Sequence, residues 1–307
     1  MDETTGKPAA DAEGGSDPRA GLSPLMRRAV ALAVIVAACA LVWGITLAQF
    51  DLSKGPTEVE FGASASDARV RLYVQPIQID PLNDSLGVRI SVVPDPSLAE
   101  AAATIADRDF LLKVRRGKQV EHVPIRANQP LPEVTFEFDL DGGDVRDYPL
   151  DRYVSVMTFS ASERAQDGTE TALPIRVTAW EGLLGFDVEG QAAPTQRPNE
   201  LQIRFAIRRT GAVSFFGLAI YGAMIVMAIC ALTIGGLVFV GMRRIEVSLA
   251  GVLGAVIFAL PALRNALPGA PPFGVRGDLL IFFWAELAAI IALCLIVWAW
   301  AHRGAPH

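Results

Sequence analysis

Residues 258–286 read FALPALRNALPGAPPFGVRGDLLIFFWAE and join two apolar runs through a segment rich in proline and glycine. Proline lacks the backbone N–H that a helix interior needs, and glycine weakens a helix, so this segment predicts a loop. The prolines concerned are Pro261, Pro268, Pro271 and Pro272. We therefore expect two helices joined by an extracytoplasmic loop over residues 264–278.

Charged residues mark both ends of this loop. Arg264, Arg276 and Asp278 lie where the apolar runs stop, whereas Glu286 lies inside the second run. An ionisable group within a membrane is energetically costly, so Glu286 is expected to face protein or water rather than lipid. Arg264 and Arg276 are its nearest candidate partners. A charge pair that fastens the loop to the helices is favoured, and an ion or proton pathway is the alternative.

The whole chain divides into apolar ends and a polar middle. Of its 307 residues 51% are hydrophobic, and the mean hydropathy is +0.36. Four apolar runs, 27–50, 213–242, 246–263 and 279–301, are long enough to cross a hydrocarbon core of about 30 Å. In the third, Gly251, Ala255 and Ala259 form a stripe of small residues that predicts close helix packing. Residues 1–26 are expected to be a disordered acidic tail and residues 302–307 a cytoplasmic tail.

The polar middle, residues 51–210, repeats with a period of two. Val70, Leu72 and Val74 alternate with polar residues, and the same pattern returns at 86–92, 134–140 and 201–207. Such alternation is typical of half-buried antiparallel strands, and about seven strands are expected. The fold class is therefore a membrane α+β protein. It has an extracytoplasmic antiparallel β-sandwich-like domain and a four-helix transmembrane bundle, with one span before the domain and three after it.

The arginines around the spans predict the topology. Arg27 and Arg28 precede the first span, Arg243 and Arg244 follow the second, and Arg303 follows the last. Positive residues favour the cytoplasmic side. The opposite face is flanked by Lys54, Arg204, Arg208, Arg209, Arg264 and Arg276. Because Arg27 and Arg28 precede the first span and long loops translocate largely regardless of charge, both termini are expected in the cytoplasm and the β domain outside a multi-pass cell-membrane protein. The last strand of the domain runs almost directly into the second span, which predicts mechanical coupling between them.

No set of residues predicts catalysis or a cofactor. The sequence has no nucleophile, metalloprotease, phosphate-loop or dinucleotide motif, and its three histidines and three cysteines do not form a zinc-binding pattern. The acidic stretch 139–147 does not match a calcium-binding loop, so a solvated turn is favoured. A net charge of −6 without a basic run gives no support for a nucleic-acid partner. We expect no enzyme activity, no cofactor and no bound metal.

The segment Tyr148-Pro-Leu-Asp-Arg-Tyr153 follows the acidic turn. Asp151 beside Arg152 is either a buried pair that pins a loop or part of a surface turn. Together with Arg264-Asn265, Pro268–Pro272 and Phe282-Phe-Trp284, this segment resembles the actinobacterial and fungal domain of unknown function forty-four thirty-six. The resemblance implies an integral membrane protein of the actinobacterial cell envelope, and it carries over no catalytic residue.

Two functions from different classes remain open. The first is a non-enzymatic envelope protein, a binding or structural module whose partners are the lipid bilayer and a lipid, wall component or protein of the envelope. The second is a component of a transporter or channel that uses Glu286 and residues 261–278. The sequence does not indicate the oligomeric state.

Overall fold

The computed structural model describes residues 24–52, 57–93, 105–106, 108–164, 169–195, 197 and 199–303. Most of the predicted acidic tail, residues 1–26, and the end of the predicted cytoplasmic tail, residues 304–307, lie outside the described residues. The chain divides into two compact units, Met1–Ala48 and Gln49–His307, which are described separately.

The first unit contains most of helix α1 (Pro24–Leu52). Within α1, Leu25–Ile45 has a mean hydropathy of 2.3, so the helix is long and apolar enough to cross a membrane. It begins three residues before the predicted span and ends two residues after it. A difference of this size is ordinary for helix ends.

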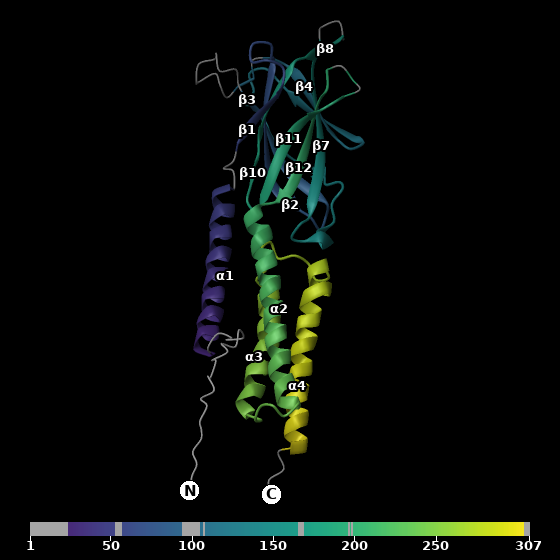
Figure 1. Cartoon of the computed structure of the whole chain (residues 1–307). Coiled ribbons are helices and arrows are strands. Elements are labelled where there is room, and N and C mark those ends of the chain that lie inside the picture. The colour runs from purple at the N-terminus through teal and green to yellow at the C-terminus, as the bar shows by residue number, and fades with distance from the viewer. Residues whose placement is uncertain are drawn as a thin grey trace, which may run out of the picture. The chain divides into compact units, whose positions relative to one another are not determined.

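The second unit opens with a β domain of two sheets (Figure 1). The first sheet has the strand order β1-β9-β2-β3-β6, and the second has the order β10-β11-β12-β7-β4-β5, with β8 paired to β7. The strands are β1 (Glu58–Gly62), β2 (Val70–Asp80), β3 (Ser85–Val93), β4 (Phe110–Arg116), β5 (Gln119–Ile125), β6 (Glu133–Asp139), β7 (Arg152–Arg164), β8 (Glu170–Leu173), β9 (Ile175–Trp180), β10 (Gly182–Leu183), β11 (Phe186–Ala193) and β12 (Leu201–Arg209).

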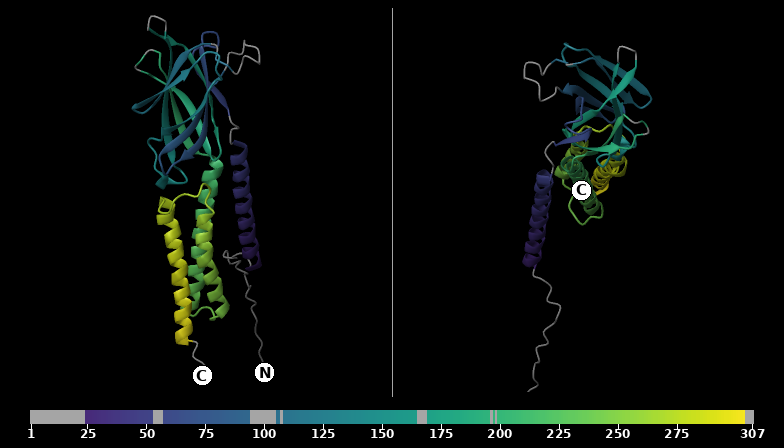
Figure 2. Two further views of the ribbon diagram at one scale, coloured as in Figure 1. Left: turned by 180° about the vertical axis from the view of Figure 1, so that it is seen from behind. Right: turned by 90° about the horizontal axis from the view of Figure 1, so that it is seen from above.

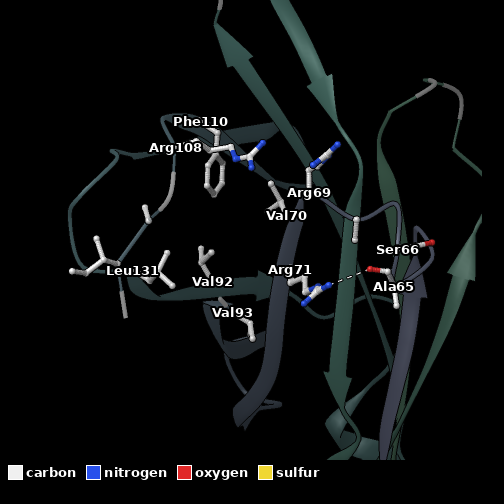
Figure 3. A pocket seen from close by; sticks show the side chains of 13 residues that line it. Ala65, Ser66, Arg69, Val70, Arg71, Val92, Val93, Arg108, Phe110 and Leu131 are labelled. Atoms are coloured by element: carbon white, nitrogen blue, oxygen red, sulfur yellow. Dashed lines mark hydrogen bonds between the residues drawn. The ribbon is translucent and has the colours of Figure 1, made fainter. Parts of the chain in front are cut away.

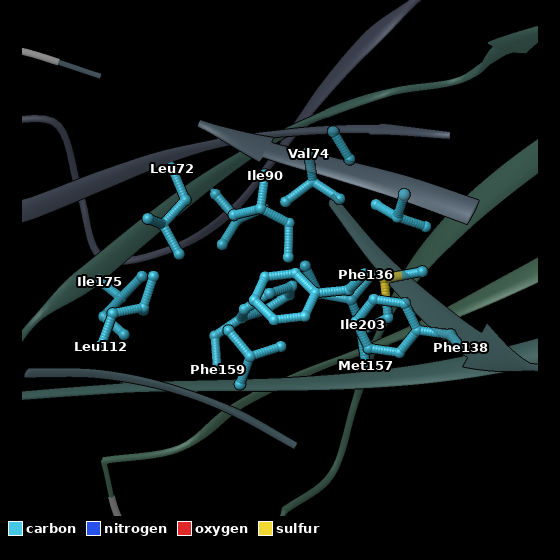
Figure 4. Packing of buried hydrophobic residues seen from close by; sticks show 14 of the residues in the cluster. Leu72, Val74, Ile90, Leu112, Phe136, Phe138, Met157, Phe159, Ile175 and Ile203 are labelled. Atoms are coloured by element: carbon cyan, nitrogen blue, oxygen red, sulfur yellow. The ribbon is translucent and has the colours of Figure 1, made fainter. Parts of the chain in front are cut away.

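The core of the domain lies between the two sheets, as a β-sandwich requires. Leu72, Val74 and Ile90 from the first sheet face Phe159 and Ile203 from the second, and all five are at most 2% exposed (Figure 4). Burying an aliphatic or aromatic side chain of this size contributes about 1.5–3 kcal/mol. The predicted alternation of apolar and polar residues therefore marks the inward-facing positions correctly.

The sandwich differs from the prediction in two respects. The described residues form twelve strands rather than about seven, because edge strands such as β5 and β10 are short or largely exposed and carry a weak alternation. One neighbouring pair, β2 and β9, is parallel rather than antiparallel. This pairing joins segments about a hundred residues apart, which a local pattern does not predict.

Three further helices complete the second unit and run side by side in Figures 1 and 2. They are α2 (Gly211–Phe239), α3 (Val247–Asn265) and α4 (Phe283–Arg303), and α4 is preceded by a π-helical turn, η2 (Asp278–Phe282). All three are long and apolar enough to span a membrane. With α1 they make four candidate spans, one before the β domain and three after it, as predicted.

Small residues bring α2 and α4 together. A Cβ atom at Gly235 would lie 2.8 Å from the Cα of Ala292, so no larger residue fits there without displacing the neighbouring helix. The predicted stripe on α3 does not serve this purpose, because a Cβ atom at Gly251 would have no neighbouring atom within 4 Å. The close helix contact therefore lies between α2 and α4 and not on the predicted stripe of α3.

The connection between α3 and α4 starts later than predicted. Pro261 lies inside α3, which continues to Asn265, so the loop comprises residues 266–277. Transmembrane helices tolerate proline because neighbouring groups satisfy the freed backbone atoms. Within the loop, Gly269 and Gly274 have positive φ angles of 75° and 95°, a conformation that favours glycine.

Candidate functional site

The end of the sandwich from which α2 emerges contacts the loop between α3 and α4. We call this region the junction and define it as residues 145–153, 209–217 and 266–278. Strand β12 ends at Arg209, and α2 begins at Gly211 after the single residue Thr210, whose Oγ1 accepts a hydrogen bond from the Val213 N–H. Figure 1 shows β12 passing directly into α2.

Tyr148 and Pro149 attach the sandwich to the helices. The Tyr148 hydroxyl donates to the Pro268 carbonyl at 2.9 Å, and the Ser214 hydroxyl donates to the Pro149 carbonyl at 2.9 Å. Gly217 of α2 allows this approach, because a Cβ there would lie 3.1 Å from the Tyr148 oxygen. Burial raises the pKa of the Tyr148 hydroxyl to about 12, so the phenol stays neutral and remains a donor at physiological pH.

A buried ion pair between Arg209 and Asp151 lies next to Tyr148. Arg209 Nε donates to Asp151 Oδ1 at 2.6 Å, and the two side chains are 5% and 0% exposed. The Tyr153 hydroxyl donates to the other carboxylate oxygen at 2.9 Å. The Arg209 guanidinium also lies over the Tyr148 and Phe186 rings, at 4.6 Å and 5.0 Å from their centroids. The pair is therefore desolvated and held on several sides.

Asp151 does pin a loop, but Arg152 is not its partner. Arg152 is exposed on β7, whereas Asp151 is buried, since neighbouring residues of an extended chain point in opposite directions. The partner, Arg209, is 58 residues away in the sequence. The sequence holds a usable signal for this pairing, because Arg209 continues the inward-facing series of Ile203, Phe205 and Ile207.

A second buried ion pair closes the loop between the end of α3 and the start of η2. Arg264 Nη2 lies 2.8 Å from Asp278 Oδ2 and also donates to the Pro272 carbonyl at 2.7 Å. Asp278 further accepts from the Gly274 N–H at 3.0 Å and from the Tyr221 hydroxyl at 3.3 Å. The two charged side chains are 4% and 7% exposed. Both carboxylate oxygens thus have partners, as a stable buried charge requires.

Arg276 contacts the sandwich instead of the helices. Its Nη1 lies 2.8 Å from Asp147 Oδ1, on the short 3₁₀ turn η1 (Val145–Asp147). The side chains are 69% and 39% exposed, so this pair contributes at most about 1 kcal/mol. It adds a weak third attachment between the loop and the sandwich.

Glu286 has neither of the partners predicted for it. Arg264 pairs with Asp278 and Arg276 with Asp147, and the buried Glu286 Oε2 has no hydrogen-bond partner among the described residues. The reason is distance along the helix, because Glu286 lies eight residues, or about 12 Å, beyond Asp278. Asp278 lies nearer to the loop and is therefore the carboxylate that pairs with Arg264.

The acidic stretch 139–147 contains a turn in which Arg146 compensates the charge of Asp144. Asp144 accepts from the Arg146 N–H and side chain at 2.8 Å, which holds the pKa of its carboxyl below the usual value. Among the described residues, no three His, Cys, Asp or Glu side chains form a group that could hold a metal ion.

In a comparison with known families, the β-sandwich and the three C-terminal helices match two different families. Residues 59–206, which form the sandwich, match the family described as Domain of unknown function (DUF4436). The sandwich is a DUF4436 domain. Residues 209–303, the three C-terminal helices, match a second Domain of unknown function (DUF8686). The DUF4436 match confirms the family resemblance over the sandwich, and the boundary between the matches falls at the end of β12. No curated protein matches the chain.

Proposed function

We propose that this chain is a non-enzymatic membrane protein of the cell envelope. Its DUF4436 sandwich is held rigidly on the transmembrane helices and presents a binding surface on the extracytoplasmic side to a lipid, wall component or protein. The observation that carries the proposal is the junction, where Asp151 and Arg209 form a buried ion pair directly above the Tyr148–Pro268 hydrogen bond.

The chemistry of the junction supports rigid attachment. A domain that only needs a membrane anchor is served by a flexible linker. Here the link is the single residue Thr210, and a tyrosine, a serine and an arginine side chain make further contacts across it. Such an arrangement fixes both the distance and the orientation of the sandwich relative to α2–α4.

The positions of the arginines support the extracytoplasmic placement. Arg243 and Arg244 lie in the turn between α2 and α3, and Arg303 lies at the end of α4, where its Nη1 donates to the Val238 carbonyl at 3.3 Å. All three are at the ends of the helices away from the sandwich. Because positive residues favour the cytoplasmic side, the sandwich belongs on the other side of the membrane.

The proposal is tested by loosening the junction in cells that naturally carry the protein. Six residues of alternating Gly and Ser inserted after Thr210 separate β12 from α2 and remove the fixed orientation of the sandwich relative to the helices. We expect this variant to reach the membrane and fail to restore the envelope phenotype of a deletion strain. The control is the same insertion after Lys118, in the turn between β4 and β5. Full restoration by the Thr210 insertion would refute rigid attachment.

A second function, a component of a transporter or channel, has one specific observation in its favour. Glu286 lies inside a candidate span, and its Oε2 is buried without a described partner. Unpaired ionisable groups in membranes often mark ion or proton pathways. In proteoliposomes with an imposed pH gradient, this alternative requires faster dissipation by the wild type than by Glu286→Gln. Equal rates would exclude a proton pathway through this carboxyl.

A further inference from the structure

Two recesses adjoin at the ends of the helices away from the sandwich. The first, of about 570 Å³, lies between the turn that joins α2 to α3 and the end of α4, and we call it the arginine recess. The second, of about 230 Å³, lies between the start of α3 and the last part of α4, and we call it the apolar groove. Ile245, Val247 and Trp300 line both, so the two form one continuous site. The described residues that line it all belong to 241–303, a stretch without a gap.

The fold brings three arginines to the arginine recess. Arg243 and Arg244 lie in the turn after α2, and Arg303 is the last residue of α4. The Arg303 Nη1 donates to the Val238 carbonyl at 3.3 Å, which holds the end of α4 against the turn (Figure 1). A Cβ atom at Gly241 would lie 3.0 Å from the same nitrogen, so the glycine allows this close approach.

Two of these arginines have donors to spare. The side chains of Arg243 and Arg244 are exposed and form no hydrogen bond or ion pair with any residue that the structure describes. In the recess of the sandwich shown in Figure 3, by contrast, the Arg71 guanidinium already donates to the Ala65 carbonyl at 3.1 Å. A guanidinium presents its N–H donors in a planar fork that matches phosphate oxygens. The arginine recess is therefore suited to a phosphate group.

The groove beside the arginines is apolar apart from Glu246. The Glu246 carboxylate accepts from the Ser248 hydroxyl at 3.4 Å. Ile296 is 2% exposed and forms the floor of the groove, whereas Val297 and Trp300 are 51% and 57% exposed. One carboxylate against three arginines leaves an excess of positive charge, and the groove offers apolar surface to cover.

The site crosses the level at which a membrane ends. The groove is formed by the candidate spans Val247–Asn265 and Asp278–Arg303, whereas Arg243 and Arg244 lie outside any candidate span. In a bilayer the groove therefore faces acyl chains and the two arginines lie among the headgroups. Trp300 lies where the two parts meet, and tryptophan is enriched at this interface.

We propose that this site binds one phospholipid whose headgroup carries a net negative charge. Its phosphate accepts hydrogen bonds from Arg243 and Arg244, and one acyl chain lies in the groove over Ile296. A free phosphate leaves the groove uncovered, and an acidic protein segment places polar groups against a surface that opens toward hydrocarbon. The inference does not depend on the function proposed for the sandwich, because the site lies at the opposite ends of the helices.

The test is native mass spectrometry of the full chain, purified in a non-ionic detergent and titrated with dioleoyl phosphatidylglycerol or dioleoyl phosphatidylcholine. We expect one phosphatidylglycerol per chain to bind at least roughly tenfold more tightly than phosphatidylcholine, and glycerol 3-phosphate at the same concentration not to displace it. Arg243→Gln combined with Arg244→Gln should weaken phosphatidylglycerol binding roughly tenfold or more and abolish the preference, because the phosphate loses charge-assisted hydrogen bonds. The charge-matched control is Arg152→Gln combined with Arg204→Gln, two exposed positions on the sandwich, which should change the affinity by less than twofold.

A second variant tests the groove while keeping every arginine. Ala250→Phe fills part of the groove and should weaken phosphatidylglycerol binding roughly fivefold or more. Val252→Phe is its control, because Val252 is on the same helix, is 51% exposed and does not line the groove. Equal binding of the two lipids, binding without a first tight molecule, displacement by glycerol 3-phosphate, or equal weakening by a control would overturn the inference.

Discussion

Removing one charge of the buried pair at the junction should destabilise the protein strongly. In Asp151→Asn the carboxylate that accepts from Arg209 and Tyr153 becomes neutral, while the guanidinium stays 5% exposed. A buried ion pair that loses one partner typically costs about 3–5 kcal/mol, because the remaining charge is left uncompensated. For a domain of about 150 residues, 3 kcal/mol corresponds to a fall in Tm of roughly 6–12 °C.

Arg209→Gln should be at least as destabilising. It leaves Asp151 without its cation and also removes the contacts with the Tyr148 and Phe186 rings, each worth about 0.5–2 kcal/mol. The double variant should cost less than the sum of the single variants by more than about 1 kcal/mol, since the second change removes a charge that the first left unpaired.

The assay is thermal unfolding of the full chain in one detergent at fixed concentration, followed by circular dichroism in the far ultraviolet. Arg152→Gln is the control, because this neighbouring arginine is exposed, and it should change stability by no more than about 0.5 kcal/mol. If Asp151→Asn lowers Tm by less than about 2 °C, or if the two single effects add without coupling, the pair does not hold the junction together.

Three further predictions follow from the helices and the turn after β2. Gly235→Leu should separate α2 from α4 and lower the yield of folded protein in detergent, whereas Gly236→Leu, where no atom lies within 4 Å, should be tolerated; equal yields would contradict the packing. Asp278→Asn should lower Tm by several degrees and Glu286→Gln should not, because Asp278 has a cationic partner and Glu286 has none among the described residues. A larger fall in Tm for Glu286→Gln than for Asp278→Asn would contradict this assignment. In a cysteine-free background, Leu82→Cys, 63% exposed, should react with an impermeant maleimide on intact cells; reaction only after lysis would reverse the topology.

The long helices and the central strands are predictable from local patterns. A run of some twenty apolar residues predicts a transmembrane helix. Alternation of apolar and polar residues, such as that of Val70, Leu72 and Val74, predicts a strand with one buried face. Both patterns can be recognised within a short stretch of sequence. Strands at sheet edges carry little of this signal. The parallel pairing of β2 with β9 depends on contacts between distant segments and has no local signature.

Pairing of charges is the least predictable part of the candidate site. Arg264 and Asp278 both stand out in the sequence, but it does not show that they bond to each other, because Glu286 and Arg276 offer competing partners. Because each helical residue rises about 1.5 Å, Asp278 lies nearer to the loop and to Arg264 than Glu286 does, and Asp278 is the residue that pairs with Arg264. The sequence offers Arg152 as a neighbour for Asp151, whereas strand geometry places adjacent side chains on opposite faces.

Because β12 passes directly into α2, a change in the tilt of α2 should move the far end of the sandwich. Helix α2 has 29 residues, or about 43 Å, against a hydrocarbon core of about 30 Å, and tilting is one way in which such a helix accommodates its excess length. With Thr210 as the only intervening residue, a change of 10° in tilt moves the far end of a sandwich roughly 25 Å long by about 4 Å. Bilayer thickness would then alter where the far end of the sandwich stands relative to the membrane surface.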